Sequence, residues 1–389
     1  MVLVCVAVHG GEGRIGRTYN VLRFGALPDG KTDFSQALLS AWGLACKDYG
    51  STVVIPKQRG AFFLNPVTLN GPCAGPITLL VNGVVRAPEK SFLTDGGPPD
   101  YWVLFNHLRQ LTVTGSGTFD GQGAFAWSVN PCKTQKYCIP FPANIKFNDV
   151  SNGVIEGISS INSKFFHIII DNSEDIEITG VTIYAPEHSL NTDGIHIERS
   201  SGVRAHNLAI STGDDCISFG QGSNDIEVYD VRCGPGHGIS IGSLGKYEEE
   251  EDVRGILVRN STLTDTTNGV RIKTWAPSPP SKLFNVTFRD IILNRVSNPI
   301  VVDQHYCPNN ECQHKGESQV GISRVKFINI VGTTGEEVSV KIDCSKDKPC
   351  EDVELVRLDI TTQNNKPTLA TCSSYGGYFL RCLSPTHCT

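Results

Sequence analysis

The segment Asp193-Gly-Ile-His-Ile-Glu198 is the first of a series of similar segments that decides the fold. The series continues as Asp215-Cys-Ile-Ser-Phe-Gly220, His237-Gly-Ile-Ser-Ile-Gly242, Asn268-Gly-Val-Arg-Ile-Lys273 and Asn298-Pro-Ile-Val-Val-Asp303, with starts 22, 22, 31 and 30 residues apart. The third and fifth residues of each segment are apolar, which is the alternation of a half-buried β-strand. A period of roughly 20–30 residues that carries short strands indicates the stacked coils of a solenoid.

A second series of short apolar segments lies between those of the first. Its members are Ile176-Glu-Ile178, Ile226-Glu-Val228, Ile256-Leu-Val258, Val286-Thr-Phe288 and Val325-Lys-Phe327. One coil cannot bury its apolar face alone, so neighbouring coils stack and share a core. The amphipathic helices that a doubly wound α/β sheet needs between its strands are missing. We therefore expect an all-β fold, a single-stranded right-handed parallel β-helix.

One helix is expected near the start of the chain. Thr32-Asp33 followed by Gln36 is typical of a capped helix N-terminus, and apolar residues follow at helical spacing at Ala37, Leu38, Ala41, Trp42 and Ala45. Such a helix would cover the open end of the stack, where an unpaired strand edge invites aggregation. Residues 19–389 are predicted to form one β-helix domain. Residues 1–18 are predicted to be a signal-peptide remnant or a disordered N-terminus.

The composition excludes several classes of protein. The 389 residues include 34 Lys and Arg against 40 Asp and Glu, so the basic excess of a nucleic-acid binder is missing. No apolar run approaches the ~20 residues of a membrane-spanning helix. The 14 cysteines lack a Cys-x-x-Cys zinc spacing and fit an oxidising compartment. We expect a secreted, extracellular monomer without nucleic-acid or membrane partners.

If the coils stack in register, residues that align in the first series lie next to one another in space. Adjacent coils lie about 4.7–4.9 Å apart, and alternate residues point to opposite faces. The fourth positions then form an outward column of His196, Ser218, Ser240 and Arg271, with Lys273 further along the same strand. Asp193, Asp215 and His237 take the first position of three successive coils, and Asp214 directly precedes Asp215. Three carboxylates and three basic side chains should therefore converge on one outer face.

A single aspartate in a solenoid turn is most often structural, because it caps the turn or bonds along the stack. In this cluster, however, mutual repulsion of three carboxylates raises at least one pKa and separates acid from base roles. A basic cluster beside them, on a protein that is acidic overall, favours an anionic ligand. We interpret the cluster as an active site. His167 and His196 are expected to have only local partners, and the run 248–252 to be a solvated loop.

Four short motifs carry a resemblance to a known family. Asn191-Thr-Asp-Gly194, Gly213-Asp-Asp215, Gly236-His-Gly238 and Arg271-Ile-Lys273, followed by Tyr306, resemble in order and spacing the signatures of the polygalacturonases, glycoside hydrolase family 28. The resemblance covers nearly the whole chain. The runs 233–238 and 243–247 resemble the plant pollen-type branch, which is often described as exopolygalacturonases.

The resemblance implies hydrolysis of the α-1,4 bonds between galacturonic acid residues of pectin, with no cofactor and no metal. Asp214 would protonate the leaving oxygen, while Asp193 and Asp215 would orient and deprotonate the attacking water. His237 would help to keep Asp214 protonated or would position it. Arg271 and Lys273 would hold the galacturonate carboxylate, and Tyr306 and Asn191 would complete the substrate site.

The stereochemical outcome involves a conflict. Neighbouring coils place the carboxylates nearer to ~5 Å apart than to ~6.5–9.5 Å, which by the usual separation rule indicates retention. The family that the chain resembles inverts the anomeric centre. We expect inversion, because two carboxylates that share one water need less room than the rule assumes.

Cysteine spacing and the resemblance together predict a set of disulfides. The short spacings Cys132/Cys138, Cys307/Cys312 and Cys344/Cys350 suit stapled loops, and the resemblance implies the pairs Cys46/Cys73 and Cys216/Cys233. If Cys5 belongs to a signal, one of Cys372, Cys382 and Cys388 should remain unpaired. Asn260 and Asn285 begin glycosylation sequons.

Several alternative functions stay open at the level of sequence. We favour exo action on the pollen-type resemblance alone, and an endo-acting polygalacturonase is the first alternative. A calcium-dependent pectate lyase uses a β-helix as well. A non-catalytic pectin-binding protein, or a hydrolase of rhamnogalacturonan or xylogalacturonan, would also carry such a surface.

Overall fold

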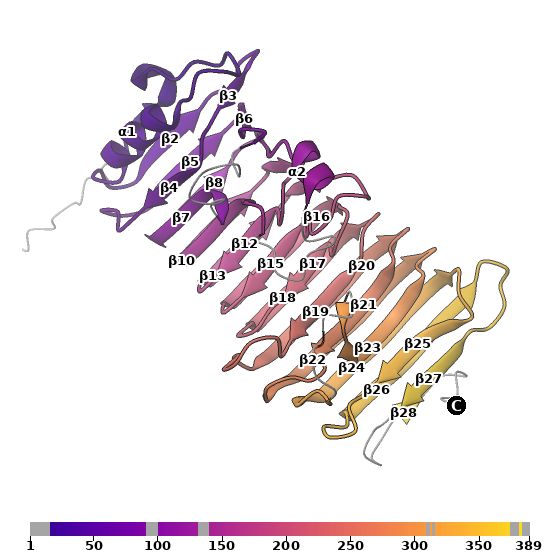
Figure 1. Ribbon diagram of the computed structural model, residues 1–389. Coiled ribbons are helices and arrows are strands. Elements are labelled where there is room, and N and C mark those ends of the chain that lie inside the picture. The colour runs from indigo at the N-terminus through magenta and orange to yellow at the C-terminus, as the bar shows by residue number, and fades with distance from the viewer. Residues whose placement is uncertain are drawn as a thin grey trace, which may run out of the picture.

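A computed structural model describes residues 16–90, 100–130, 140–308, 312, 316–373 and 381–382. In these residues 28 strands stack into coils along one axis, with the N-terminal coils at one end and the C-terminal coils at the other (Figure 1). Successive coils pair through parallel strands in register. The fold is the right-handed parallel β-helix predicted from the sequence.

The strands form three ladders, of which the first bears the site. It consists of β4 (Val67–Asn70), β7 (Tyr101–Arg109), the first half of β10 (Ala143–Glu156), β12 (Ile168–Asp171), β15 (Ile195–Glu198), β17 (Ile217–Phe219), β19 (Ile239–Leu244), β21 (Asn268–Trp275), β23 (Asn298–Tyr306), β25 (Val338–Asp343) and β27 (Leu369–Ser373).

The second ladder runs the length of the stack. It consists of β1 (Thr18–Asn20), β2 (Ser51–Ile55), β5 (Ile77–Val81), β8 (Leu111–Thr114), the second half of β10, β13 (Glu174–Thr179), β16 (Ser201–Ser211), β18 (Asn224–Cys233), β20 (Val253–Thr264), β22 (Ser281–Asn294), β24 (Val320–Thr334), β26 (Glu351–Thr362) and β28 (Arg381–Cys382). The third comprises β3 (Ala61–Phe63), β6 (Val84–Arg86), β9 (Thr118–Asp120), β11 (Ser159–Ile161) and β14 (Thr182–Tyr184), and joins the second half of β16. From β16 onward one long bent strand serves both ladders.

The core lies inside the coils and is built from the predicted inward positions. Ile195, Ile217, Ile239, Val270 and Ile300 are neighbours in one column, and each is at most 1% exposed. Full burial of such a side chain contributes about 1.5–3 kcal/mol. A slip of one residue would turn each of these side chains to the outside, so the repeated pattern sets the register.

The bends within the long strands need residues that tolerate left-handed backbone. Asn207, Asp230, Asn260, Asp290 and Asn329 form one such column, with φ between 49° and 56°. Asn and Asp adopt this conformation more easily than other side chains, because they bond locally to the backbone. The structural interpretation of Asn and Asp therefore holds at these bends. The sequon residue Asn260 belongs to this column, and Asn285 has a left-handed backbone at another bend. Both are exposed, and their glycosylation stays a prediction.

The predicted helix is α1 (Ser35–Ala45), which packs against β1, β2 and β4 at the N-terminal end of the stack (Figure 1). Its five predicted apolar residues are all buried. Its N-cap residue is Phe34, which makes no side-chain cap, so the predicted cap is wrong in its detail, although Asp33 Oδ1 still accepts from the backbone N–H of Ser35 at 3.0 Å. The other helices described are η1 (Val21–Phe24) and α2 (Ala124–Val129). β1 begins at Thr18, one residue before the predicted start of the domain, and residues 1–15 lie outside the described part.

The disulfides follow the predicted pairing wherever they are described. Cys46–Cys73, Cys216–Cys233, Cys307–Cys312 and Cys344–Cys350 are bonded. Cys372 is also disulfide-bonded, so it is not the unpaired cysteine of the C-terminal group. Cys132, Cys138, Cys388 and the side chain of Cys382 lie outside the described residues.

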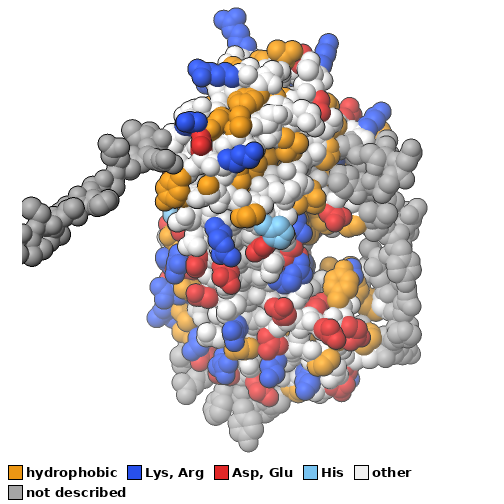
Figure 2. All heavy atoms as spheres, turned by 90° about the vertical axis from the view of Figure 1, so that its left-hand side faces the viewer, with side chains coloured by type: hydrophobic (Ala, Val, Ile, Leu, Met, Phe, Trp, Pro, Cys, Tyr) orange, Lys and Arg blue, Asp and Glu red, His pale blue; other side chains and the backbone are white. Residues whose placement is uncertain are grey.

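Charge is mixed on the face of the molecule shown in Figure 2. Acidic and basic side chains intermingle over its lower half, and neither sign forms a continuous stripe there. A nucleic-acid surface would show clustered basic side chains. Within the described ranges, no helix has both the length and the apolar character needed to cross a membrane.

Candidate active site

Three neighbouring strands place the catalytic candidates side by side. Asp193, Asp215 and His237 each lie two residues before the first residue of β15, β17 and β19, which pair in register. Backbone hydrogen bonds extend this ladder to the residues just before the strands. Gly194 N–H donates to the carbonyl of Asp215 at 2.9 Å, and Cys216 N–H donates to that of Gly238 at 2.7 Å. The structure thus brings together the side chains that the alignment placed in one column.

Glycines let the coils approach closely at this level. A Cβ on Gly213 would lie 1.9 Å from the carbonyl oxygen of Ser189, which no side chain can tolerate. Gly238 has φ +87°, and a Cβ there would lie 2.1 Å from the carbonyl oxygen of Asn268. A larger residue at either position would push apart the coils that carry the carboxylates.

Asp214 is held by a histidine and an amide. His237 Nδ1 donates to its Oδ1 at 2.9 Å, and Asn191 Nδ2 approaches its Oδ2 at 3.4 Å. Burial alone would raise the pKa of Asp214, but the hydrogen bond and charge of His237, and then the charge of Lys273, hold that pKa below its ordinary value. The same hydrogen bond raises the pKa of His237. In the free site, therefore, His237 favours an ionised Asp214, so of the two roles expected for this histidine its hydrogen bond suits the positioning of Asp214 rather than its protonation.

Asp193 has a different environment. It is 6% exposed, and its Oδ2 accepts from the Ser218 hydroxyl at 2.7 Å. Burial, followed by the charges of Asp214 and Asp215, raises the pKa of Asp193 well above its ordinary value. The rise in pKa that was predicted from the repulsion of three carboxylates therefore occurs at Asp193. The Ser218 hydroxyl lies 2.8 Å from His196 Nδ1, so a chain of hydrogen bonds runs outward from this carboxyl group.

Asp215 is the most deeply buried of the three carboxylates, with a side chain 1% exposed. Its Oδ1 accepts from the Ser240 hydroxyl at 2.7 Å and from Arg271 Nη2 at 3.2 Å, and its Oδ2 accepts from Lys273 Nζ at 2.9 Å. Two cations balance this charge, which is what a buried carboxylate requires. Arg271 and Lys273 are therefore fixed beside the acids before any ligand arrives.

Tyr306 completes the cationic side of the site. Its ring centroid lies 5.5 Å from Lys273 Nζ and 5.8 Å from the ring of Trp275. Burial raises the pKa of the Tyr306 hydroxyl, so that hydroxyl stays neutral at physiological pH. All of the sequence-predicted site residues thus belong to one continuous cluster.

Two serines of the predicted outward column are buried instead of exposed. Ser218 and Ser240 do occupy the fourth positions beside His196 and Arg271, but they are 2% and 0% exposed. The carboxylates of the preceding coil cover them, and each hydroxyl donates to one of these carboxylates. The alignment predicts the positions of both serines but no function for them. The serine that recurs in two successive coils, directly beside the column of acids, could have indicated hydrogen bonds to those acids.

Among the residues that the structure describes, two clusters have the residue types of a metal site. In Asp214, Asp215 and His237, one ligand atom of each lies within 4.8 Å of the others. Arg271 and Lys273 already oppose the carboxylate charge, and the raised pKa of His237 favours its charged form, so this cluster suits an anion better than a cation. In the second cluster, Asp303, His305 and Asp343, the histidine also pairs with Glu317 at 3.3 Å.

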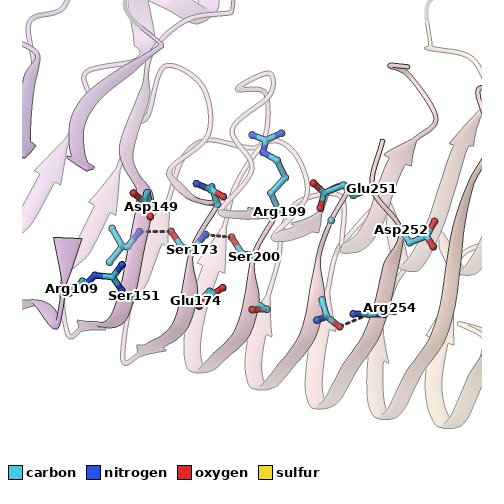
Figure 3. A pocket seen from close by; sticks show the side chains of 15 residues that line it. Arg109, Asp149, Ser151, Ser173, Glu174, Arg199, Ser200, Glu251, Asp252 and Arg254 are labelled. Atoms are coloured by element: carbon cyan, nitrogen blue, oxygen red, sulfur yellow. Dashed lines mark hydrogen bonds between the residues drawn. The ribbon is translucent and has the colours of Figure 1, made fainter. Parts of the chain in front are cut away.

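A separate hollow crosses the bends at the other ends of the same strands (Figure 3). It has a volume of 590 Å³ and is lined by side chains of both signs, among them Arg109, Glu174, Arg199 and Arg254. Arg199 directly follows β15, whereas Asp193 precedes it, so this hollow is distinct from the catalytic cluster. Arg199 is already paired with Asp171 at 2.6 Å and with Glu198 at 2.9 Å.

Comparison with known proteins identifies the family. The family model described as glycosyl hydrolases family 28 matches residues 46–376. The chain belongs to this family. It is 43% identical over 364 residues to an exopolygalacturonase of Platanus acerifolia, covering 92% of this chain and 94% of that protein. It is 42% identical over 371 residues to a polygalacturonase of Gossypium barbadense, covering 95% and 90%.

Two solved structures share the fold of this chain. An endo-xylogalacturonan hydrolase from Aspergillus tubingensis superposes with a TM-score of 0.79 at 23% identity, over 92% of this chain and 96% of that chain. An exopolygalacturonase from Thermotoga maritima superposes with a TM-score of 0.73 at 21% identity, over 89% and 87%. The predicted family is confirmed, and the family 28 chain described here is a glycoside hydrolase.

Proposed function

We propose that this family 28 enzyme is a polygalacturonase that hydrolyses α-1,4 bonds between galacturonic acid residues of pectin and acts from the chain end. The observation that carries the proposal is the contact of Asp215 with both Arg271 and Lys273, beside Asp193 and Asp214. A hydrolase of a polyanion needs a proton donor, a base for water and cations for the substrate carboxylate. These groups occupy one surface here. The names of the plant relatives agree with this assignment.

Arg271 and Lys273 are the candidates for holding the galacturonate carboxylate. Arg271 donates through Nε to Ser240 and through Nη2 to Asp215, and no described residue bonds to its Nη1. A planar guanidinium that is fixed on one side can present its other N–H groups to a carboxylate. Lys273 adds a compact charge beside it. Asp215 in this scheme positions the cations and the attacking water.

Asp214 is the proposed general acid, and the arrival of substrate would change its protonation. In the free site His237 and Lys273 hold its pKa low. A substrate carboxylate on Lys273 offsets one of these positive charges, and a sugar ring displaces water from the carboxyl group. Both changes raise the pKa of Asp214 and favour the protonated form needed for the leaving oxygen. Asp193 is the proposed base, since only one of its oxygens is bonded to a described residue.

Inversion is the proposed stereochemical outcome. Proton NMR of the first product formed from polygalacturonate distinguishes the anomers before they equilibrate. Release of the β-anomer from the α-linked substrate supports direct attack by water held between Asp193 and Asp215. Release of the α-anomer would instead require a covalent intermediate on one of these carboxylates.

Product analysis on polygalacturonate tests the activity and the mode of action together. Exo action yields monomer from the first time point, whereas endo action yields a ladder of oligomers. No reducing ends from pure protein that nevertheless binds the polymer would favour the non-catalytic alternative. A rate on xylogalacturonan or rhamnogalacturonan that exceeds the rate on polygalacturonate would move the substrate to another pectin.

Chelation separates the hydrolase from a calcium-dependent lyase. The cations around Asp214 and Asp215 oppose a bound divalent metal, so activity should persist in EDTA. The products should also lack the absorbance of an unsaturated uronide. Loss of activity in EDTA that calcium restores would contradict the proposed mechanism.

We also propose that the enzyme is secreted and acts in the cell wall as a monomer. The described disulfides suit an oxidising compartment, and the substrate class is extracellular. Immunolocalisation of the tagged protein and light scattering test location and oligomeric state.

A further inference from the structure

A second group of aromatic and basic side chains continues from the cationic side of the site. Lys246 follows β19, Trp275 ends β21 and Tyr306 ends β23, and Trp275 pairs with Tyr306 just after a shift in the register of these two strands. Lys246 Nζ lies 5.4 Å from the ring centroids of both Tyr247 and Trp275. Trp275 in turn contacts Tyr306, whose ring lies 5.5 Å from Lys273 Nζ. We call Lys246, Tyr247 and Trp275 the lysine platform.

The turn that carries the lysine platform is held in place by Glu250. Its Oε2 accepts from the backbone N–H of Gly245 at 2.6 Å, and its Oε1 accepts from those of Lys246 and Tyr247 at 2.8 and 3.0 Å. This residue belongs to the acidic run that was expected to be a solvated loop. Three charge-assisted bonds to successive amides fix the backbone, so the side chains of the turn are presented on a rigid base.

The charge and one ring of the lysine platform are exposed, and its second ring, that of Trp275, is half-buried. Lys246 is exposed, and no described carboxylate oxygen lies within 4.0 Å of its ammonium. Tyr247 is 63% exposed, so its ring is free to contact a ligand. Lys273, by contrast, is buried and paired with Asp215. An exposed ammonium beside one exposed ring and one half-buried ring is complementary to a uronate, which combines a carboxylate with apolar C–H faces on the sugar ring.

We propose that the lysine platform is a further subsite that binds the next uronate residue of the chain beyond the one held by Arg271 and Lys273. This inference rests on the proposed function, because it extends the same polysaccharide along the same surface. Trp275 and Tyr306 connect the two positions without a break. The carboxylate of the added residue pairs with Lys246, and its ring packs against Tyr247 and Trp275.

Substrate length provides the test. Digalacturonate spans the scissile bond, and a third residue reaches the lysine platform. The measured quantity is the ratio of kcat/KM for trigalacturonate to kcat/KM for digalacturonate. Lys246→Gln should lower this ratio about tenfold, the scale of one charge-assisted contact. Lys246→Arg, which keeps the charge over the rings, should preserve the ratio.

A matched control separates this effect from general electrostatics. Arg324 also lies over an aromatic ring, 5.1 Å from the centroid of Phe284, but on a flank away from the site. Arg324→Gln removes the same charge and should leave the ratio unchanged. Equal losses by Lys246→Gln on both substrates, or no loss on either, would overturn the subsite. Failure of the unmodified enzyme to cleave any oligogalacturonide would refute the proposed function itself.

Discussion

Asp193, Asp214 and Asp215 are chemically identical side chains in three different environments. Asp215 is bonded to two cations, Asp214 to a histidine, and Asp193 to a serine hydroxyl. Burial raises the pKa of Asp193, and His237 outweighs burial at Asp214. In the free site this order is the reverse of the proposed roles, in which Asp214 gives a proton and Asp193 takes one, so the proposed mechanism depends on substrate raising the pKa of Asp214.

Asp214→Asn tests the proposed acid directly. The amide keeps the shape and can still accept from His237, but it cannot protonate a leaving oxygen. We expect kcat to fall by roughly 10²–10⁴-fold, the usual contribution of general acid catalysis. Reducing-end assays measure the loss, and thermal unfolding checks that the fold persists. Retention of most of the activity by a folded variant would remove Asp214 from this role.

Ser218→Ala tests the support of Asp193. The hydrogen bond from Ser218 lowers the pKa of Asp193 against the effect of burial. Its loss should raise that pKa further, so the base ionises only at higher pH and the acidic limb of the kcat/KM profile moves to higher pH.

Ser223 provides the matched control for this change. It is also a buried serine, but its hydroxyl donates to the backbone carbonyl of Ile197 at 2.9 Å and contacts no catalytic carboxylate. Ser223→Ala should leave the pH profile in place. An unshifted profile in Ser218→Ala would show that this hydroxyl has no effect on the titration of Asp193.

At the scale of elements, a disulfide ties the catalytic coil to the next strand of the same coil. Cys216 directly follows Asp215, and Cys233 ends β18, 17 residues away. The double change Cys216→Ala/Cys233→Ala should lower the free energy of unfolding by about 3 kcal/mol, from the loop entropy of a closed segment of this length. It should also reduce kcat, because Asp215 loses an anchor. Denaturant unfolding and turnover measure the two effects.

The Cys344–Cys350 disulfide is the control for this prediction. It closes a segment of only six residues after β25, away from the carboxylates. Its removal should cost about 2 kcal/mol by the same argument and should leave kcat unchanged. A fall in kcat of equal size in both double variants would show that general stability, rather than the position of Asp215, limits turnover.

At the scale of the whole molecule, stability should depend on pH through the site. The pKa of His237 is raised from 6.5, so its stabilising charge is fully present below about 6.5 and is lost as pH rises through the higher folded value. The raised pKa of Asp193 acts in the same direction, since ionising this buried group opposes folding. We expect a higher unfolding temperature at pH 5 than at pH 8.

His237→Gln is the variant that isolates the histidine contribution. It removes the titrating group, so the difference in unfolding temperature between pH 5 and pH 8 should shrink. The half-buried His206 lies on β16, away from the site, and pairs with Glu177 at 2.6 Å; it serves as a control. An unchanged difference in His237→Gln would place the pH dependence elsewhere.

Family membership also belongs to the whole molecule, because the match extends over residues 46–376. Signature motifs in the correct order would mean little on an unrelated fold. Here the stacked coils place them at adjacent levels. The lysine platform was not found from the sequence, although the run 243–247 was noted as a resemblance, because nothing local shows that Lys246 meets Trp275.

The repeat in the sequence by itself determined the β-helix, its register, the buried column from Ile195 to Ile300, helix α1 and the level of the three carboxylates. These features follow from periodic patterns of apolar and polar residues. Each coil repeats the same pattern, so the evidence for the fold grows with the number of coils. Only the tertiary structure decided the pairing of Asp215 with Lys273, the burial of Ser218 and Ser240, and the unequal pKa values of the acids. Lys273 and Asp215 are 58 residues apart, and their contact depends on side-chain conformations and desolvation that no periodic pattern encodes.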